Sequence, residues 1–151
     1  FGNMPGDLIA ASFDMLRHLT ERLPESLTEK FDYVLIDAPC SGSGTLRRNP
    51  EIKWRIQAAD LAEIAKIQNT ILHNAAFAVR KGGHLIYCTC SLLPRENENV
   101  INSFLRFNPD FSVCPPPPFI SPRLIDSGGF FRTFPPWHNM DGFFAAVLKR
   151  K

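Results

Sequence analysis

Two cysteines stand where a thiol could act on a substrate. Cys40 ends the segment Asp37-Ala-Pro-Cys40, directly after the apolar run Phe31–Ile36. Cys90 follows the apolar run His84–Tyr87. Both runs are typical of buried parallel strands, so both thiols and the Asp37 carboxylate are expected at one edge of a single sheet. Enzymes with α/β folds place their chemistry at that edge.

The surroundings of the two thiols favour Cys90 as the nucleophile. Cys90 lies shortly before Pro94, where a helix is predicted to begin, and the exposed N–H groups of a helix N-terminus favour a thiolate. Cys40 precedes Gly42-Ser-Gly44, which permits a turn or the close approach of a ligand. A simple turn beside a buried cysteine would have the same sequence, so the role of Cys40 stays open. Cys88 and Cys114 are interpreted as structural.

A basic segment separates the two cysteine motifs. Four cations surround Trp54 there: Arg47, Arg48, Lys53 and Arg55. Phosphate contacts and a stacking surface would explain this composition, and so would a solvated loop. Its position directly after Gly44 favours substrate binding.

The elements that must position these residues follow an α/β order. Apolar spacing predicts a helix over residues 60–80, ended by Gly82-Gly83, and a second helix that begins at Pro94. Strands are expected at Phe111–Val113 and at Phe143–Leu148. The order predicts an α/β fold: the C-terminal half of a doubly wound, mostly parallel sheet whose last two strands form an antiparallel hairpin.

Composition sets further bounds. A chain of 151 residues with 44% hydrophobic and 21% charged residues supports one core and one domain. The formal charge of +2 is too small to indicate nucleic-acid binding by itself. The four cysteines lack zinc-site spacing, so no metal is expected. No apolar run reaches the roughly 20 residues that a membrane span needs, and the start at Phe1 indicates a piece of a longer protein.

Two longer segments resemble a known family. Phe31–Trp54 and Tyr87–Glu98 resemble motifs IV and VI of the Sun-type (NSUN/RsmB-like) RNA cytosine-5 methyltransferases, and Asp141–Ala146 resembles the closing strand of that family. The resemblance implies a Rossmann-like class I fold that transfers a methyl group from S-adenosylmethionine to carbon 5 of a cytosine in rRNA or tRNA. It implies a cytoplasmic location in a bacterium and a nucleolar one in a eukaryote.

The resemblance also assigns roles to residues. It implies that Cys90 is the nucleophile, that Cys40 assists release of the enzyme from the product, and that Asp37 contacts the cytosine edge. Cofactor contacts are expected at Asp37, Pro39 and Asp14, with Asp7 as the competitor of Asp14. RNA is the implied partner of the basic residues Arg47, Arg48, Lys53 and Arg55.

The same resemblance defines what this chain lacks. The glycine-rich cofactor loop of the family should precede this segment and is not found. Residues 1–151 are therefore expected to be the C-terminal portion of one catalytic domain, inactive when isolated.

Two other functions fit the same residues. In an amino-group nucleic-acid methyltransferase, Asp37-Ala-Pro-Cys40 would act without a covalent thiol step. In a non-catalytic RNA-binding scaffold, the sheet would persist without cofactor binding.

Overall fold

The computed structural model describes residues 8–10 and 25–151, and its described strands form one six-stranded sheet. The strands are β1 (Leu8–Ala10), β2 (Phe31–Asp37), β3 (Val79–Thr89), β4 (Phe111–Val113), β5 (Phe131–Thr133) and β6 (Phe143–Arg150). The α-helices are α2 (Ile52–Arg55), α3 (Ala58–Ala76), α4 (Glu98–Phe107) and α5 (Pro135–His138). Single 3-10 turns are η2 (Glu25–Leu27), η3 (Ser43–Thr45), η4 (Pro94–Glu96) and η5 (Pro122–Leu124).

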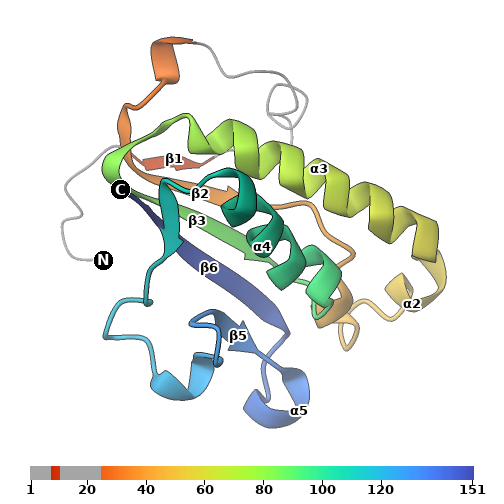
Figure 1. Ribbon diagram of the computed structural model, residues 1–151. Coiled ribbons are helices and arrows are strands. Elements are labelled where there is room, and N and C mark those ends of the chain that lie inside the picture. Colours follow the sequence, from red (N-terminus) through yellow and green to blue (C-terminus); the bar gives the residue numbers. More distant parts are fainter. Residues whose placement is uncertain (1–7, 11–24) are drawn as a thin grey trace.

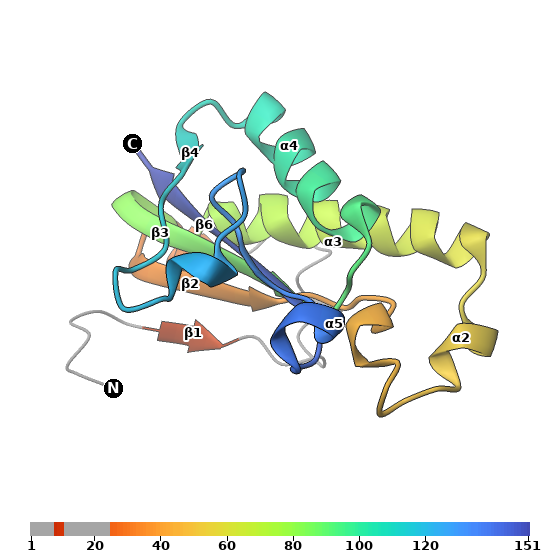
Figure 2. The same ribbon diagram turned by 90° about the horizontal axis from the view of Figure 1, so that it is seen from below.

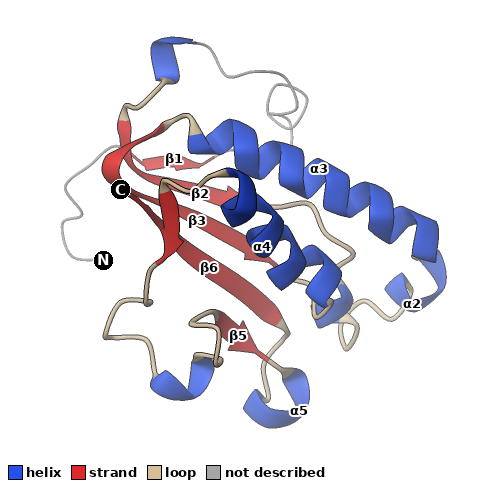
Figure 3. Ribbon diagram, viewed as in Figure 1, coloured by secondary structure: helices blue, strands red, loops and turns tan. Residues whose placement is uncertain are grey.

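The sheet has the strand order β1-β2-β3-β6-β4, and β5 also pairs with β6 (Figure 1). β2 runs parallel to both β1 and β3, whereas β6 is antiparallel to β3, β4 and β5. Helix α3 connects β2 to β3, so these elements form the predicted β-α-β unit (Figure 3). The predicted α/β class, a mostly parallel sheet with a final antiparallel strand, is confirmed.

Helices α3 and α4 cover one face of this sheet (Figure 2). Alternate residues of β3 point toward them, so Leu85 and Tyr87 are fully buried while His84 and Ile86 on the other face are half-buried. Phe104 of α4 lies fully buried at the centre of the helical layer. Its ring meets those of His73 and Phe111 edge to face, with a centroid distance of 5.2 Å in each case. These apolar contacts fix the helical layer on the sheet.

The glycine pair expected to end the first long helix lies inside β3 instead. α3 ends at Ala76 because the chain turns there to pair with the start of β2: the carbonyl of Phe77 accepts from Glu29, and that of Ala78 accepts from Phe31. A Cβ at Gly83 would lie 3.0 Å from the carbonyl oxygen of Phe31. Glycine is therefore needed where the two strands approach each other closely.

The second predicted helix is interrupted. Pro94 opens the short turn η4, and α4 begins only at Glu98, because Asn97 has non-helical dihedrals of φ −116° and ψ −100°. The buried Asn97 side chain bonds the Thr89 hydroxyl and the Ser91 carbonyl, which holds this break in place. β5 was not predicted, since its three residues carry no alternating pattern. Among the described residues, no helix has both the length and the apolar character needed to cross a bilayer.

The buried ring of Phe104 gives a direct test of the helical layer. Phe104→Ala should lower the free energy of unfolding of the protein by about 3–5 kcal/mol, because the ring leaves a cavity among His73, Phe111 and the sheet. Phe107→Ala, on the exposed side of the same helix, should cost about 0.5 kcal/mol or less. Urea denaturation followed by circular dichroism measures both, and equal losses would contradict this packing.

Candidate active site

The register of β2 against β3 brings the two cysteine loops together. Asp37 pairs with Cys88 at the carboxyl ends of the strands, and the Ala38 N–H donates to the Cys88 carbonyl at 2.9 Å. Beyond this point the Sγ atoms of Cys40 and Cys90 lie 3.1 Å apart, within hydrogen-bond distance. The prediction that both thiols reach the same edge of the sheet is confirmed.

Glycine contacts join three segments that are far apart in the sequence. The Gly44 N–H donates to the Cys90 carbonyl at 2.9 Å, and the Gly142 N–H donates to the Gly44 carbonyl at 2.9 Å. A Cβ at Gly44 would lie 2.1 Å from the Gly142 carbonyl oxygen, so no larger residue fits without displacing backbone. Gly44 is therefore required because two backbone segments approach each other closely there. The sequence alone allowed either a turn or the close approach of a ligand at this position.

The two thiols have opposite acid strengths because they share one hydrogen bond. The hydrogen bond from Cys40 lowers the pKa of Cys90 to about 7, although burial opposes this shift. The same hydrogen bond, followed by burial and the charge of Cys90, raises the pKa of Cys40 far above its usual range. When the pair ionises, the proton is therefore lost from Cys90, while Cys40 keeps its own and donates it to the Cys90 sulfur.

The cause of the low Cys90 pKa differs from the one expected. The sequence pointed to the dipole of a helix starting at Pro94, but α4 begins only at Glu98. The partner thiol supplies the main effect. Cys88, on the same face of the strand, has its pKa raised to about 11 by burial and by the negative charge of Asp37. Cys88 therefore remains a neutral thiol at neutral pH, consistent with its structural interpretation.

A buried carboxylate behind the thiols was missed by sequence reasoning. Glu96 is fully buried, and its oxygens accept hydrogen bonds from the Ser41 N–H at 2.7 Å and from the Ser41 hydroxyl at 2.6 Å. It also accepts from the Ser91 hydroxyl, so one side chain bridges the residues that follow Cys40 and Cys90. A serine directly after each cysteine was the available signal.

The predicted cofactor residues lie partly within this site. Asp37 is exposed at the end of β2, and its charge also raises the pKa of Cys90. Pro39 is half-buried, and its carbonyl accepts from the Gln68 amide of α3 at 2.8 Å. Asp14 and Asp7 lie outside the described residues. Asp37 and Pro39 thus sit at the expected edge, on the loop that carries Cys40.

The basic segment is divided between two environments. Arg47 and Arg48 both face the buried Asp141 carboxylate, and Arg48 forms the closer ion pair. These two arginines therefore attach the loop after Cys40 to the start of β6. Lys53 instead lies over the ring of Trp54, with its ammonium 5.2 Å from the ring centroid. Trp54 is 77% exposed, and Lys53 and Arg55 are exposed beside it.

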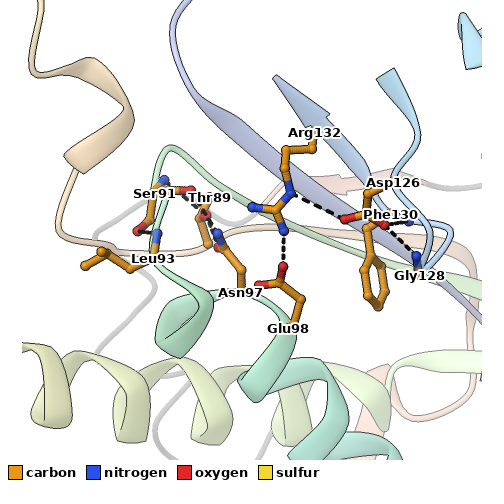
Figure 4. A network of polar contacts seen from close by, with 9 residues as sticks. All are labelled: Thr89, Ser91, Leu93, Asn97, Glu98, Asp126, Gly128, Phe130 and Arg132. Carbon is orange, nitrogen blue, oxygen red and sulfur yellow. Dashed lines mark hydrogen bonds and ion pairs between the residues drawn. The ribbon is translucent and has the colours of Figure 1, made fainter. Parts of the chain in front are cut away.

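A second polar network involves residues that follow Cys90 in the chain and residues of β5 and the loop before it (Figure 4). Arg132 of β5 forms ion pairs with Glu98 at the start of α4 and with Asp126. Its guanidinium lies over the Phe144 ring at 5.1 Å. This network ties β5 and β6 to the segment that follows Cys90. In the part of the chain that the structure describes, no three His, Cys, Asp or Glu residues are grouped to hold a metal ion.

The mixed α/β sheet, with paired cysteines beyond the ends of adjacent strands, agrees with the resemblance of the sequence to the Sun-type family. The chain belongs to the 16S rRNA methyltransferase RsmB/F family, whose family model matches residues 7–149. It is 38% identical over 129 residues to the probable ribosomal RNA small subunit methyltransferase B of Bacillus subtilis. It is 41% identical over 123 residues to ribosomal RNA small subunit methyltransferase B of Salmonella arizonae.

Each of these alignments covers 82% of the chain but only 28% and 27% of the two relatives, respectively. The chain thus spans less than a third of their length. Two solved structures from Pyrococcus horikoshii share the fold. NSun6, described with SFG, has a TM-score of 0.69 and 25% identity over 95% of this chain and 34% of its own. A methyltransferase homolog protein has a TM-score of 0.63 and 29% identity over 93% of this chain and 43% of its own.

The shared hydrogen bond makes Cys90 reactivity depend on Cys40. In Cys40→Ala, the pKa of Cys90 should rise from about 7 to 9 or above, since burial and the charges of Asp37 and Glu96 then outweigh the remaining backbone hydrogen bond that lowers it. Alkylation of Cys90 by iodoacetamide at pH 7 should slow about tenfold or more and recover as the pH rises. Peptide mass spectrometry measures this rate.

Cys114→Ala is the matched control, because Cys114 lies after β4 and not among the groups that shift the pKa of Cys90. An unchanged pH profile in Cys40→Ala would show that the thiol pair does not set the reactivity of Cys90.

Proposed function

We propose that the protein containing this chain transfers a methyl group from S-adenosylmethionine to carbon 5 of a cytosine in ribosomal RNA, through a covalent adduct on Cys90. The observation that carries this function is the Cys40–Cys90 pair, whose sulfur atoms lie 3.1 Å apart and whose hydrogen bond lowers the pKa of Cys90 and raises that of Cys40. Membership of the RsmB/F family favours rRNA over tRNA as the substrate.

The thiol pair suits the chemistry of a cytosine ring. Carbon 5 is a poor nucleophile, but addition of the Cys90 thiolate to carbon 6 converts the ring to an enamine-like species that reacts at carbon 5. Asp37 is exposed at the end of β2, and its proposed role is to contact the N3 and amino edge of the ring and stabilise its charge. The target base must present its face to Cys90, so an unpaired or extruded nucleotide is required.

The later step needs a base, and the geometry supports Cys40 in that role. Its pKa is high mainly because it donates a hydrogen bond to Cys90. Once the Cys90 sulfur is bonded to carbon 6, that sulfur carries no charge and the main cause of the high pKa disappears. Cys40 then becomes easier to deprotonate at the stage when the carbon 5 proton must leave and the carbon–sulfur bond must break.

S-adenosylmethionine supplies the methyl group as a positively charged sulfonium electrophile when it is bound. Asp37 and Pro39 fit such a cofactor, because a carboxylate and a fixed backbone lie at the carboxyl edge of the parallel strands. Asp14 or Asp7 is proposed as a further contact. Since the chain spans less than a third of the relatives' length, residues 1–151 are proposed to form the C-terminal part of one catalytic domain, inactive when isolated.

RNA contact is proposed for the basic segment beside the thiols. Trp54 offers an exposed stacking surface, and Lys53 and Arg55 add positive charge next to it. Arg47 and Arg48 are more than half exposed although they face Asp141, so each can also meet a phosphate.

Trapping on modified RNA tests the covalent step in the complete protein. With S-adenosylmethionine and target RNA carrying 5-fluorocytosine, the native protein should form a stable adduct, because fluorine cannot leave carbon 5 as a proton does. Cys90→Ala should form none, and Cys40→Ala should still form it, more slowly at pH 7 because the pKa of Cys90 is then higher. A denaturing gel detects the adduct as a band of lower mobility.

Cys88→Ser is the control, since this neighbouring thiol on the same face of β3 should be dispensable for trapping. If the native protein methylates ordinary RNA but Cys40→Ala forms no adduct, the two-cysteine mechanism is refuted. Methylation without any trapped adduct would instead favour the amino-group reaction.

The basic segment predicts a change in salt dependence. Replacing Arg47 and Arg48 by alanine should weaken RNA binding and reduce the slope of log affinity against log salt by about 0.7 for each phosphate that the variant no longer neutralises. Filter binding over a range of salt concentrations measures the slope. Lys66→Ala removes an exposed charge from α3 and should leave the slope unchanged. If the salt slope is the same in the Arg47/Arg48 variant and in Lys66→Ala, these two arginines do not contact RNA phosphates.

A further inference from the structure

We infer that Glu96 is a positioning residue that clamps the Cys40 and Cys90 loops against each other, a role that rests on the proposed function because Cys90 is the nucleophile there. Glu96 touches neither thiol. It acts through Ser41 and Ser91, the residues that directly follow the two cysteines.

The clamp consists of hydrogen bonds that converge from separate elements on one carboxylate. Oε1 accepts from the Ser41 N–H at 2.7 Å and lies 3.4 Å from the Gln68 amide nitrogen of α3. Oε2 accepts from the hydroxyls of both Ser41 and Ser91. An ionised carboxylate is an acceptor only, so all of these donors can point at it at once. One side chain thus bridges the loops after β2 and β3, in addition to the backbone contact between Gly44 and Cys90.

The position of the carboxylate is itself fixed. The hydroxyl of the fully buried Tyr87 donates to the Glu96 carbonyl at 2.7 Å, which anchors η4 to β3. Ser43 extends the network, because its hydroxyl lies 3.1 Å from the Ser91 hydroxyl and accepts from the Leu92 N–H at 2.9 Å. The Glu96 backbone and the Ser91 side chain are thus each held by further hydrogen bonds.

Burial makes this arrangement costly, which argues that it serves the site. Glu96 is fully buried, and within residues 25–151 it takes part in no ion pair with a Lys, Arg or His. A buried carboxylate without a cation is stable only if hydrogen bonds replace its hydration. Here those bonds come from the residues beside the thiols and from Gln68, whose amide also holds the Pro39 carbonyl. The free-energy cost of burying Glu96 therefore falls beside the site where the two sulfur atoms must stay 3.1 Å apart.

Two substitutions separate positioning from simple electrostatics. Glu96→Gln keeps the shape: its amide oxygen can accept from Ser41 N–H, and its amide nitrogen can donate to the two hydroxyls after they rotate. Glu96→Ala removes the side-chain bonds to Ser41 and Ser91, while the Gly44–Cys90 and Ser43–Ser91 contacts remain. The negative charges that act on Cys90 are those of Asp37 and Glu96, and both raise its pKa. Loss of the Glu96 charge alone would therefore lower the pKa of Cys90 in both variants.

The experiment follows iodoacetamide alkylation of Cys90 against pH in the complete protein, by peptide mass spectrometry. For Glu96→Ala, the half-titration point should rise from about 7 toward 9, with alkylation at pH 7 about tenfold or more slower, because Cys40 is no longer held at hydrogen-bond distance from Cys90. For Glu96→Gln, the point should stay at or below about 7. A lower half-titration point in both variants, or no change in Glu96→Ala, would overturn the clamp.

Glu98→Ala is the matched control, because Glu98 lies two residues further on and binds Arg132 instead of the cysteine loops. It should leave the Cys90 profile unchanged, and an equal shift would also overturn the clamp. Ser91→Ala serves if Glu96→Ala does not fold, and should raise the half-titration point by a smaller amount. Alkylation needs neither RNA nor cofactor, so the clamp can fail while methyl transfer is observed, or hold while it is not.

Discussion

Parallel pairing between β2 and β3 determines where the reactive groups lie. Asp37 stands opposite Cys88 in this register, and the two loops leave the sheet side by side. A slip of one residue would turn every side chain of a strand to the other face. Cys90 would then point toward the helices instead of the half-exposed face that it shares with Cys88. The positions of the two thiols therefore depend on this register. The register in turn depends on the buried side chains that must face the helices.

Strand pairing ends before the thiols, so the loops need other restraints. Backbone hydrogen bonds at Gly44 hold the Cys90 carbonyl on one side, and the buried Glu96 carboxylate holds Ser41 and Ser91 on the other. Gly44 allows a backbone contact that is too close for any side chain. The Glu96 carboxylate orients the two serine side chains by accepting hydrogen bonds from both. Together they keep two sulfur atoms close without a covalent bond between them, which leaves both available for chemistry.

Local patterns were sufficient to predict β2, most of β6, β4, the end of β3, the β-α-β unit and the meeting of Cys40 with Cys90 at one sheet edge. The two central strands were found because a buried parallel strand is a continuous apolar run. They failed where distant residues decide. Gly83 looked like the end of a helix but is needed for close strand contact. Glu96 follows Pro94, where an acid is common in a first helical turn, and its partner Ser41 lies fifty-five residues away in the sequence. The acid strength of Cys90 was expected from a helix and comes from a thiol fifty residues away.

The location of β6 has a consequence for how the protein is made. β6 comes last in chain order among the described strands, yet it lies between β3 and β4 and also pairs with β5. A ribosome delivers the chain from its N-terminal side, so β3 waits with one edge unpaired until residues 143–150 emerge. During that interval an apolar strand edge is exposed to other nascent chains. Gly142 also arrives late, so the two cysteine loops reach their final geometry only after residue 142 has emerged.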